Sequence, residues 1–147
     1  MNTPDSIYEN TLYLIGEIGK TIRDNVIKTI RNEGYDITPE QFTILVLLYY
    51  KDGLNQQEIA KGVNRDKTTV SRVLNRMLKN KLIAKKSDSG DQRENFIYIS
   101  QKGKVIQEKL INATGPIYLN ALNNIPEKEV SNLNKTLLKI LLNINNN

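Results

Sequence analysis

The sequence contains no cysteine and no histidine, and these two absences exclude several kinds of chemistry. Disulfides, thiol redox sensors, Cys/His zinc sites and histidine-dependent catalytic triads are all excluded for this chain. The acidic residues are scattered, and no glycine-rich phosphate loop follows an expected strand. We therefore expect no enzymatic activity and no cofactor. We assign no metal site, although carboxylate and carbonyl oxygens alone remain open as metal ligands.

Long apolar runs are also absent. The longest, residues 44–50, is far below the ~20 residues that a membrane span requires. The first ten residues, MNTPDSIYEN, lack a basic region followed by an apolar block, so no secretion signal is expected. A length of 147 residues, with 39% hydrophobic and 25% charged residues, fits one folded core of ordinary size. We expect a cytoplasmic protein without membrane contact.

Positive charge is concentrated in one stretch, residues 61–93. It holds ten lysines and arginines against three aspartates, a net charge of +7. The rest of the chain holds eleven basic and thirteen acidic residues, a net charge of −2, so the overall excess of +5 lies in this stretch. A local positive field attracts a polyanion, although a charge run can also be a solvated helix face. The order of residues inside the stretch has to decide between the two.

Apolar residues recur at spacings of three and four along much of the chain, which predicts helices. The first should cover residues 5–32, with Asp5 or Ser6 as its cap. Two more helices should begin with capping boxes. In a capping box the side chains of two polar residues three positions apart each accept a hydrogen bond from the other's backbone amide. These boxes lie at residues 38–41 and 55–58. The helix after the first box is apolar on nearly all sides, so we expect it in the middle of the domain.

The basic stretch contains a fourth helix over residues 67–80, with Asp66 as its cap. A tight turn at residues 62–65 joins it to the short helix before it. Its apolar stripe faces one way and its basic and hydrogen-bonding residues face the other, which is typical of a helix-turn-helix. Strands at 82–86 and 96–99, around a turn at 87–91, then predict a small basic hairpin, or wing.

Two helices close the chain. One runs from Ser100 toward Leu122 and should be interrupted at Gly115-Pro116, since proline within a helix removes a backbone hydrogen bond. The other starts near Pro126 and carries a leucine and isoleucine stripe to Ile144.

The first and last helices each carry an apolar stripe that the small central unit cannot cover. A symmetric homodimer would bury both stripes. The expected fold class is therefore mainly α, a winged helix-turn-helix with a small β-hairpin wing, flanked by N- and C-terminal dimerisation helices. We divide the chain into a helical dimerisation region, residues 1–34 and 100–147, and a DNA-binding domain, residues 35–99.

The order of these parts and three strings of residues resemble the MarR family of winged helix-turn-helix transcription regulators. The strings are TPEQFTILVLL at residues 38–48, NQQEIAKGVNRDKTTVSRVLNRMLKNKLIAKK at 55–86 and DQRENFIYISQKG at 91–103. The match is specific because a capping box, a recognition helix and an Asp-x-Arg wing all occur at the expected separations.

The resemblance implies a homodimeric repressor that binds double-stranded DNA at a palindromic operator and is released by a small-molecule ligand. Its recognition helices would enter successive major grooves, and its wings would reach flanking minor grooves. The residues that we assign to DNA binding are Arg65, Lys67, Thr68, Thr69, Ser71, Arg72, Asn75, Arg76, Lys85, Lys86, Asp91 and Arg93. Those that we assign to a ligand crevice are Tyr8, Tyr13, Tyr35 and Tyr49, although buried tyrosines are more often core residues.

The chain departs from the family pattern at four positions. Lys81 replaces the glycine that usually ends the recognition helix, so either Asn80 or Lys81 adopts the left-handed conformation or the helix ends in a different way. Ser87 and Ser89 replace wing prolines, and Pro116 is unusual within its helix. An alternative hypothesis is a winged-helix protein-interaction module that uses the same basic face for an acidic partner.

Overall fold

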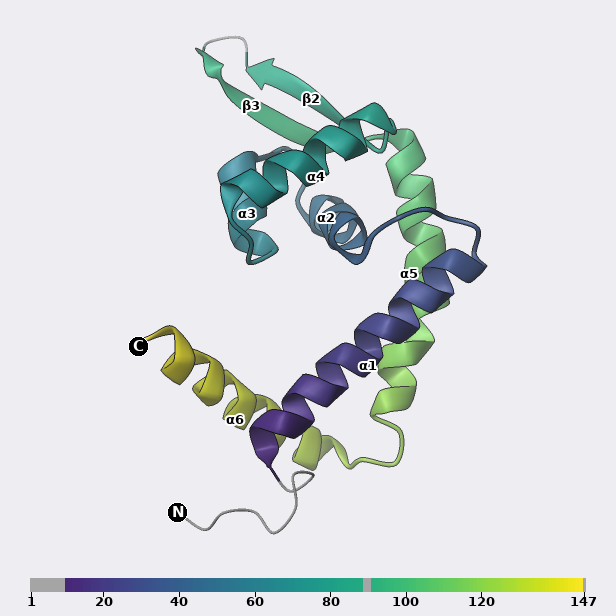
Figure 1. The fold of residues 1–147 in the computed structure, drawn as a ribbon, viewed down its shortest axis with the longest axis vertical. Coiled ribbons are helices and arrows are strands. Elements are labelled where there is room, and N and C mark those ends of the chain that lie inside the picture. The colour runs from purple at the N-terminus through teal and green to yellow at the C-terminus, as the bar shows by residue number, and fades with distance from the viewer. Residues whose placement is uncertain (1–9, 89–90, 147) are drawn as a thin grey trace. The chain divides into compact units, whose positions relative to one another are not determined.

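The computed structural model describes residues 10–88 and 91–146, except for the side chains of residues 88 and 91–94. The chain is mainly helical and carries one small antiparallel sheet (Figure 1). In chain order the elements are α1 (Thr11–Asn32), α2 (Pro39–Tyr50), β1 (Leu54–Asn55), α3 (Gln56–Gly62), α4 (Lys67–Lys79), β2 (Ile83–Asp88), β3 (Asp91–Ile99), α5 (Gln101–Ala121) and α6 (Glu127–Asn145). The predicted class, a mainly α winged helix-turn-helix, is confirmed.

The chain forms two compact units. The first is Met1–Thr114 and contains the helix-turn-helix and the sheet, and the second is Gly115–Asn147 and contains α6. Within the first unit, α2 supplies much of the core, because Phe42, Ile44, Leu45 and Leu48 are all buried. Its start follows the sequence prediction, with Thr38 and Gln41 forming the capping box and Pro39 in the first turn.

The first helix begins later than predicted. α1 starts at Thr11, and Asn10 caps it by accepting hydrogen bonds from the amides of Leu12 and Tyr13 at 3.0 and 3.1 Å. Asp5 and Ser6, the predicted caps, lie outside the described residues. The end of α1 is as expected, because Gly34 follows it with φ +79°, a conformation that glycine adopts without steric penalty.

The sheet has the order β1-β3-β2, with both neighbouring pairs antiparallel. The wing strands are longer than predicted, since β2 reaches residue 88 and β3 begins at residue 91. Most of the predicted turn at residues 87–91 is therefore strand. The sequence also did not reveal β1, whose two residues pair with Ile97 and Phe96 on β3.

α5 is one continuous helix, contrary to the predicted interruption at Gly115-Pro116. Pro116 lies within it. Its start agrees with the prediction, because the hydroxyl of Ser100 accepts a hydrogen bond from the amide of Gly103 at 2.9 Å. Among the residues that the structure describes, no helix is both long and apolar enough to span a bilayer. The same residues contain no group of three or more acidic side chains that could hold a metal ion.

Candidate nucleic-acid interface

The interface begins with the short helix α3. Asn55 and Glu58 form its capping box, with the two backbone-to-side-chain hydrogen bonds both at 2.9 Å. Glu58 also pairs with Lys51 at 3.1 Å on the surface. The backbone amide of Asn55, and then the hydrogen bond from Lys51, lower the pKa of Glu58 below its usual value. These local contacts fix where the first helix of the pair starts.

The turn between α3 and α4 depends on one residue in the left-handed conformation. Asn64 has φ +51°, and asparagine tolerates this region better than most residues. The amide of Asn64 bonds to the carbonyl of Lys61, and the amide of Arg65 bonds to that of Ala60 at 3.0 Å. This is the Schellman pattern, which ends a helix and reverses the chain. As a result, only four residues separate the end of α3 from the start of α4.

Asp66 caps α4, as predicted. Its carboxylate accepts hydrogen bonds from the amide and the hydroxyl of Thr69, at 2.8 and 2.6 Å. These bonds lower the pKa of Asp66, with the hydroxyl contributing most. The hydroxyl of Thr69, one of the residues assigned to DNA binding, therefore takes part in the cap.

α4 has a buried face and a polar face. Val70, Leu74 and Met77 are buried against the core. The opposite face carries exposed or half-exposed basic and polar side chains, namely Lys67, Thr68, Ser71, Arg72, Asn75, Arg76 and Lys79. Among the described side chains, none of these cations has an acidic partner. The face therefore offers hydrogen-bond donors and positive charge that the protein itself does not neutralise.

The wing places its two assigned lysines on opposite faces. Lys85 pairs with Ile97 on β3 and faces α4, where it lines a hollow with Ser71 and Asn75. Lys86 faces the other side, with its ammonium 5.1 Å from the centre of the Tyr98 ring. Of the two, only Lys85 is brought together with the polar face of α4.

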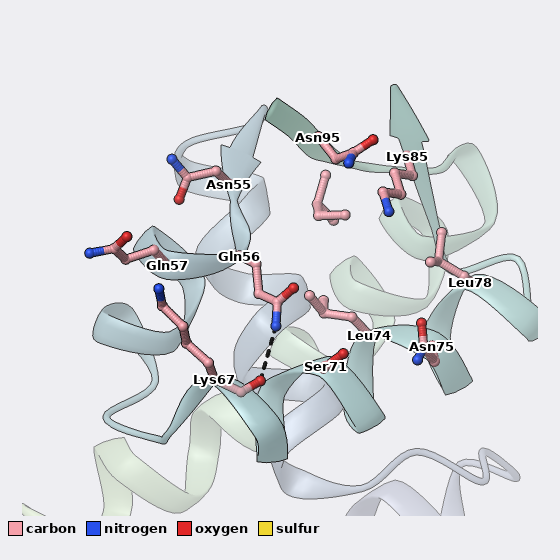
Figure 2. A pocket seen from close by; sticks show the side chains of 11 residues that line it. Asn55, Gln56, Gln57, Lys67, Ser71, Leu74, Asn75, Leu78, Lys85 and Asn95 are labelled. Carbon is pink, nitrogen blue, oxygen red and sulfur yellow. Dashed lines mark hydrogen bonds between the residues drawn. The ribbon is translucent and has the colours of Figure 1, made fainter. Parts of the chain in front are cut away.

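The space between α4, the start of α3 and the wing is a hollow of about 370 Å³, which we call the α4–wing hollow. Figure 2 shows the polar side chains around it. The amide of Gln56 donates a hydrogen bond to the carbonyl of Lys67 at 3.0 Å across its lower edge. Its lining residues are Asn55, Gln56, Gln57, Lys67, Ser71, Leu74, Asn75, Leu78, Lys85, Asn95 and Ile97.

Four of these polar residues were missed in the sequence: Asn55, Gln56, Gln57 and Asn95. The alternation of β3 could have indicated Asn95, because it lies two residues from Ile97 on the same face as Lys85. No comparable signal places Gln56 or Gln57 beside α4, since that contact depends on how the two helices pack.

The other assigned residues lie elsewhere or outside the description. Arg65 is exposed in the turn before α4. The backbone of Asp91 and Arg93 lies in β3, and their side chains are outside the described part of the chain. Of the tyrosines, Tyr8 is not among the described residues and Tyr13 and Tyr35 are half-buried. Tyr49 is 50% exposed and meets the ring of Tyr50 edge-on. None of these three described tyrosines lines the α4–wing hollow.

Comparison with known proteins agrees with this geometry. The model of the MarR family matches residues 37–95. The transcriptional regulator MgrA of Staphylococcus aureus is 31% identical over 107 residues, which cover 73% of this chain and 71% of MgrA. YsmB, an uncharacterised HTH-type transcriptional regulator of Bacillus subtilis, is 24% identical over 86% of this chain and 90% of its own. The crystal structure of S. aureus MepR in complex with DNA superposes with a TM-score of 0.85 at 27% identity, covering 95% of this chain and 99% of MepR.

Proposed function

This chain belongs to the MarR family of transcriptional regulators, and from that membership we propose that it is a homodimeric repressor which reads a palindromic operator and is released by a small molecule. Members of this family are DNA-binding regulators and not enzymes. The observation that carries the proposal is the polar face of α4. It is held beside the wing, is positively charged and has no acidic partner among the described side chains.

The proposed roles on this face follow from side-chain chemistry. Arg72 and Asn75 can each make two hydrogen bonds to one base edge, arginine to guanine and asparagine to adenine. Thr68 and Ser71 donate and accept single hydrogen bonds, which suits phosphates and sets the position of the helix on the duplex. Lys85 adds charge from the wing on the same side of the sheet. We therefore assign sequence reading to Arg72 and Asn75, and contacts with the DNA backbone to Thr68, Ser71 and the wing.

The homodimer is supported by apolar side chains that the single chain leaves in water. On α1, Leu12 and Ile18 are 62% and 58% exposed. On α6, no residue is buried, and Leu137, Leu138 and Leu141 line a shallow groove. Apolar area of this extent is unusual on a monomer and is typical of a partner surface. A two-fold dimer would bury both helices with one self-complementary arrangement and would explain a palindromic operator.

The ligand response is supported by the family resemblance, which implies a crevice between the dimerisation helices and the winged unit. Tyr8, Tyr13, Tyr35 and Tyr49 are the proposed lining residues. A ligand would act by favouring a dimer geometry whose recognition helices no longer match grooves about 34 Å apart. A compound screen tests this part. An effector should raise the melting temperature and weaken the operator complex, and compounds that only stabilise the protein would contradict it.

The DNA-binding part is tested with a duplex from the protein's own upstream region and a scrambled duplex of the same composition. Wild-type protein should prefer the upstream duplex in an anisotropy titration. Arg72→Ala should remove most of that preference, because a bidentate contact contributes about 1–3 kcal/mol of discrimination. Arg72→Lys is the matched control, since it keeps the charge but loses the planar pair of donors. It should bind scrambled DNA like wild type and still lack the preference.

Two outcomes would count against the proposal. Equal affinity of the wild-type protein for both duplexes would contradict sequence-specific regulation. Unchanged DNA affinity in Arg72→Ala, together with loss of a bound protein in a pull-down, would support the alternative of an interaction module for an acidic partner.

A further inference from the structure

Three consecutive carbonyl groups at the end of α4 all accept hydrogen bonds from the start of α5. The ammonium of Lys102 donates to the carbonyl of Asn80 at 3.0 Å. The hydroxyl of Ser100 donates to the carbonyl of Lys81 at 2.7 Å, and the amide of Ser100 donates to that of Leu82 at 3.1 Å. We call this set of three bonds the α4–α5 latch. It joins residues about twenty positions apart in the sequence, with the whole wing between them.

Ser100 immediately precedes α5 and bonds to both segments that the latch connects. Its hydroxyl donates to Lys81 and accepts from the amide of Gly103, so one group caps α5 and holds the end of α4. Lys81 has φ +57° and ends α4 in a Schellman turn, in which the amide of Leu82 bonds to the carbonyl of Met77. The carbonyls of Asn80 and Lys81 thereby point out of the helix and are available to α5.

Gly103 allows the two segments to come this close. A Cβ atom on Gly103 would lie 2.2 Å from the carbonyl oxygen of Leu82 and 2.9 Å from the Ile99 side chain. The first contact is with backbone, which cannot move aside as a flexible side chain can. The first turn of α5 therefore packs directly on the chain that leaves α4, and its position is coupled to the direction of α4.

Lys102 lies in α5, but its side chain bonds to the end of α4. It lies in the first turn of α5, where the positive end of the helix dipole disfavours a cation. At the end of α4 the dipole has the opposite sign, and a lysine there is favoured and can bond the last carbonyls. The side chain is exposed, so its contribution to overall stability is small. Its hydrogen bond is made to the backbone at the end of α4.

We propose that Lys102 is a positioning residue for DNA recognition, which acts through the backbone of Asn80 to hold the polar face of α4 at the angle that sequence reading requires. The proposal rests on the DNA-binding function proposed above. Because Lys102 acts on the protein's own backbone, it changes the discrimination between DNA sequences. A lysine that touched phosphate would change the affinity for all sequences alike.

The experiment first selects duplexes from a randomised pool with wild-type protein, which establishes a specific probe. Affinity for the selected and for a random duplex is then measured at several salt concentrations for Lys102→Met, Lys102→Arg and Lys104→Met. Lys104→Met is the matched control, because Lys104 is an exposed lysine of the same helix whose side chain has no hydrogen bond or ion pair within the described residues.

We expect Lys102→Met to lower the ratio of selected to random affinity about two- to tenfold, the range for one lost hydrogen bond. Its salt dependence on random DNA should equal that of Lys104→Met. Lys102→Arg can still donate to the Asn80 carbonyl and should restore the ratio. A salt slope lower by about 1 only in Lys102→Met would overturn the proposal in favour of a direct phosphate contact. An unchanged ratio would overturn it outright, whereas failure of the pool to enrich any sequence would instead count against the proposed function.

Discussion

The side-chain amide of Gln56, the first residue of α3, donates a hydrogen bond to the backbone carbonyl of Lys67, the first residue of α4, at 3.0 Å. The two helices of the helix-turn-helix are thus joined at their starts as well as through the turn. This bond spans the edge of the α4–wing hollow, close to the polar face that we assign to DNA (Figure 2).

Gln56→Ala should therefore destabilise the winged unit by about 1 kcal/mol, the usual net value of one hydrogen bond. Urea unfolding followed by circular dichroism measures it. Gln57→Ala is the matched control, because Gln57 is the next residue, is exposed, and its side chain makes no hydrogen bond within the described residues. It should change stability by less than about 0.5 kcal/mol. Equal losses for the two variants would mean that the Gln56 bond contributes nothing of its own.

Lys81→Gly should stabilise the protein by about 1 kcal/mol. Lys81 has φ +57°, a conformation that disfavours any residue with a Cβ atom, and the latch uses only its backbone carbonyl. The control is Asn80→Gly. Asn80 has φ −83°, so glycine there relieves no strain and only adds freedom to the unfolded chain. In thermal melts the melting temperature should rise for Lys81→Gly and fall for Asn80→Gly. A lower melting temperature for Lys81→Gly would contradict the inference that Lys81 is strained.

Lys85→Met and Lys86→Met should differ in DNA binding although they remove the same charge from adjacent residues. Lys85 faces α4, whereas Lys86 lies over the ring of Tyr98 on the other face of the wing. We expect Lys85→Met to weaken binding to all sequences and to lower the salt slope by about 1. Lys86→Met should leave that slope close to wild type. Identical slopes for both variants would show that the face of the wing does not matter.

The cap of α4 should make stability depend on pH at the acid end. Hydrogen bonds from Thr69 hold the pKa of Asp66 below its usual value of 3.8, so the unfolded state takes up a proton before the folded state does. The contribution of this cap is complete above the unfolded pKa and is lost as the pH falls through the folded pKa.

Asp66→Asn is the corresponding variant, because asparagine also caps helices but does not titrate. The free energy of unfolding is measured from pH 6 down to the acid limit, on the order of pH 2 where such carboxylates protonate. It should fall less steeply with decreasing pH in this variant than in the wild type. Identical pH profiles for wild type and Asp66→Asn would remove Asp66 from the acid response.

Gln107→Met should stabilise the protein by about 1–3 kcal/mol. Gln107 is 1% exposed, and neither its amide nitrogen nor its amide oxygen has a hydrogen-bond partner among the described residues. Methionine has a similar length and shape and leaves no polar atom unsatisfied. Gln41, also buried, is the contrast, because its side chain serves the cap of α2. Gln41→Met should therefore destabilise, and a loss of stability in both variants would contradict an unsatisfied amide at Gln107.

The features that the sequence predicted well depend on short-range geometry. The boxes at Thr38 and Asn55 and the cap at Asp66 each need only residues three positions apart, and all three are confirmed. The missing glycine after α4 indicated a left-handed Asn80 or Lys81, or a different helix end, and the structure shows the left-handed conformation at Lys81. Family membership was predictable for the same reason, since its strings cover these local signals.

The features that were missed depend on contacts between distant segments. The wing is longer than predicted because the pairing of Ser87 with Asn95 stabilises residues whose own composition indicates a turn. The α4–wing hollow requires the packing of α3 on α4, which no periodicity shows. The predicted interruption of α5 at Pro116 is wrong, because a proline removes only one backbone hydrogen bond of a helix and the remaining bonds keep α5 continuous.

The continuity of α5 through Pro116 also bears on the local unfolding of this helix. Pro116 has no amide hydrogen, so the carbonyl of Asn112 has no donor four residues later, and this gap lies beside the boundary between the compact units at Thr114. Proteins open locally in cooperative units, and amides within one such unit exchange together. The rate of deuterium uptake should therefore differ between the parts of α5 before and after Thr114. One continuous helix would then belong to two foldons.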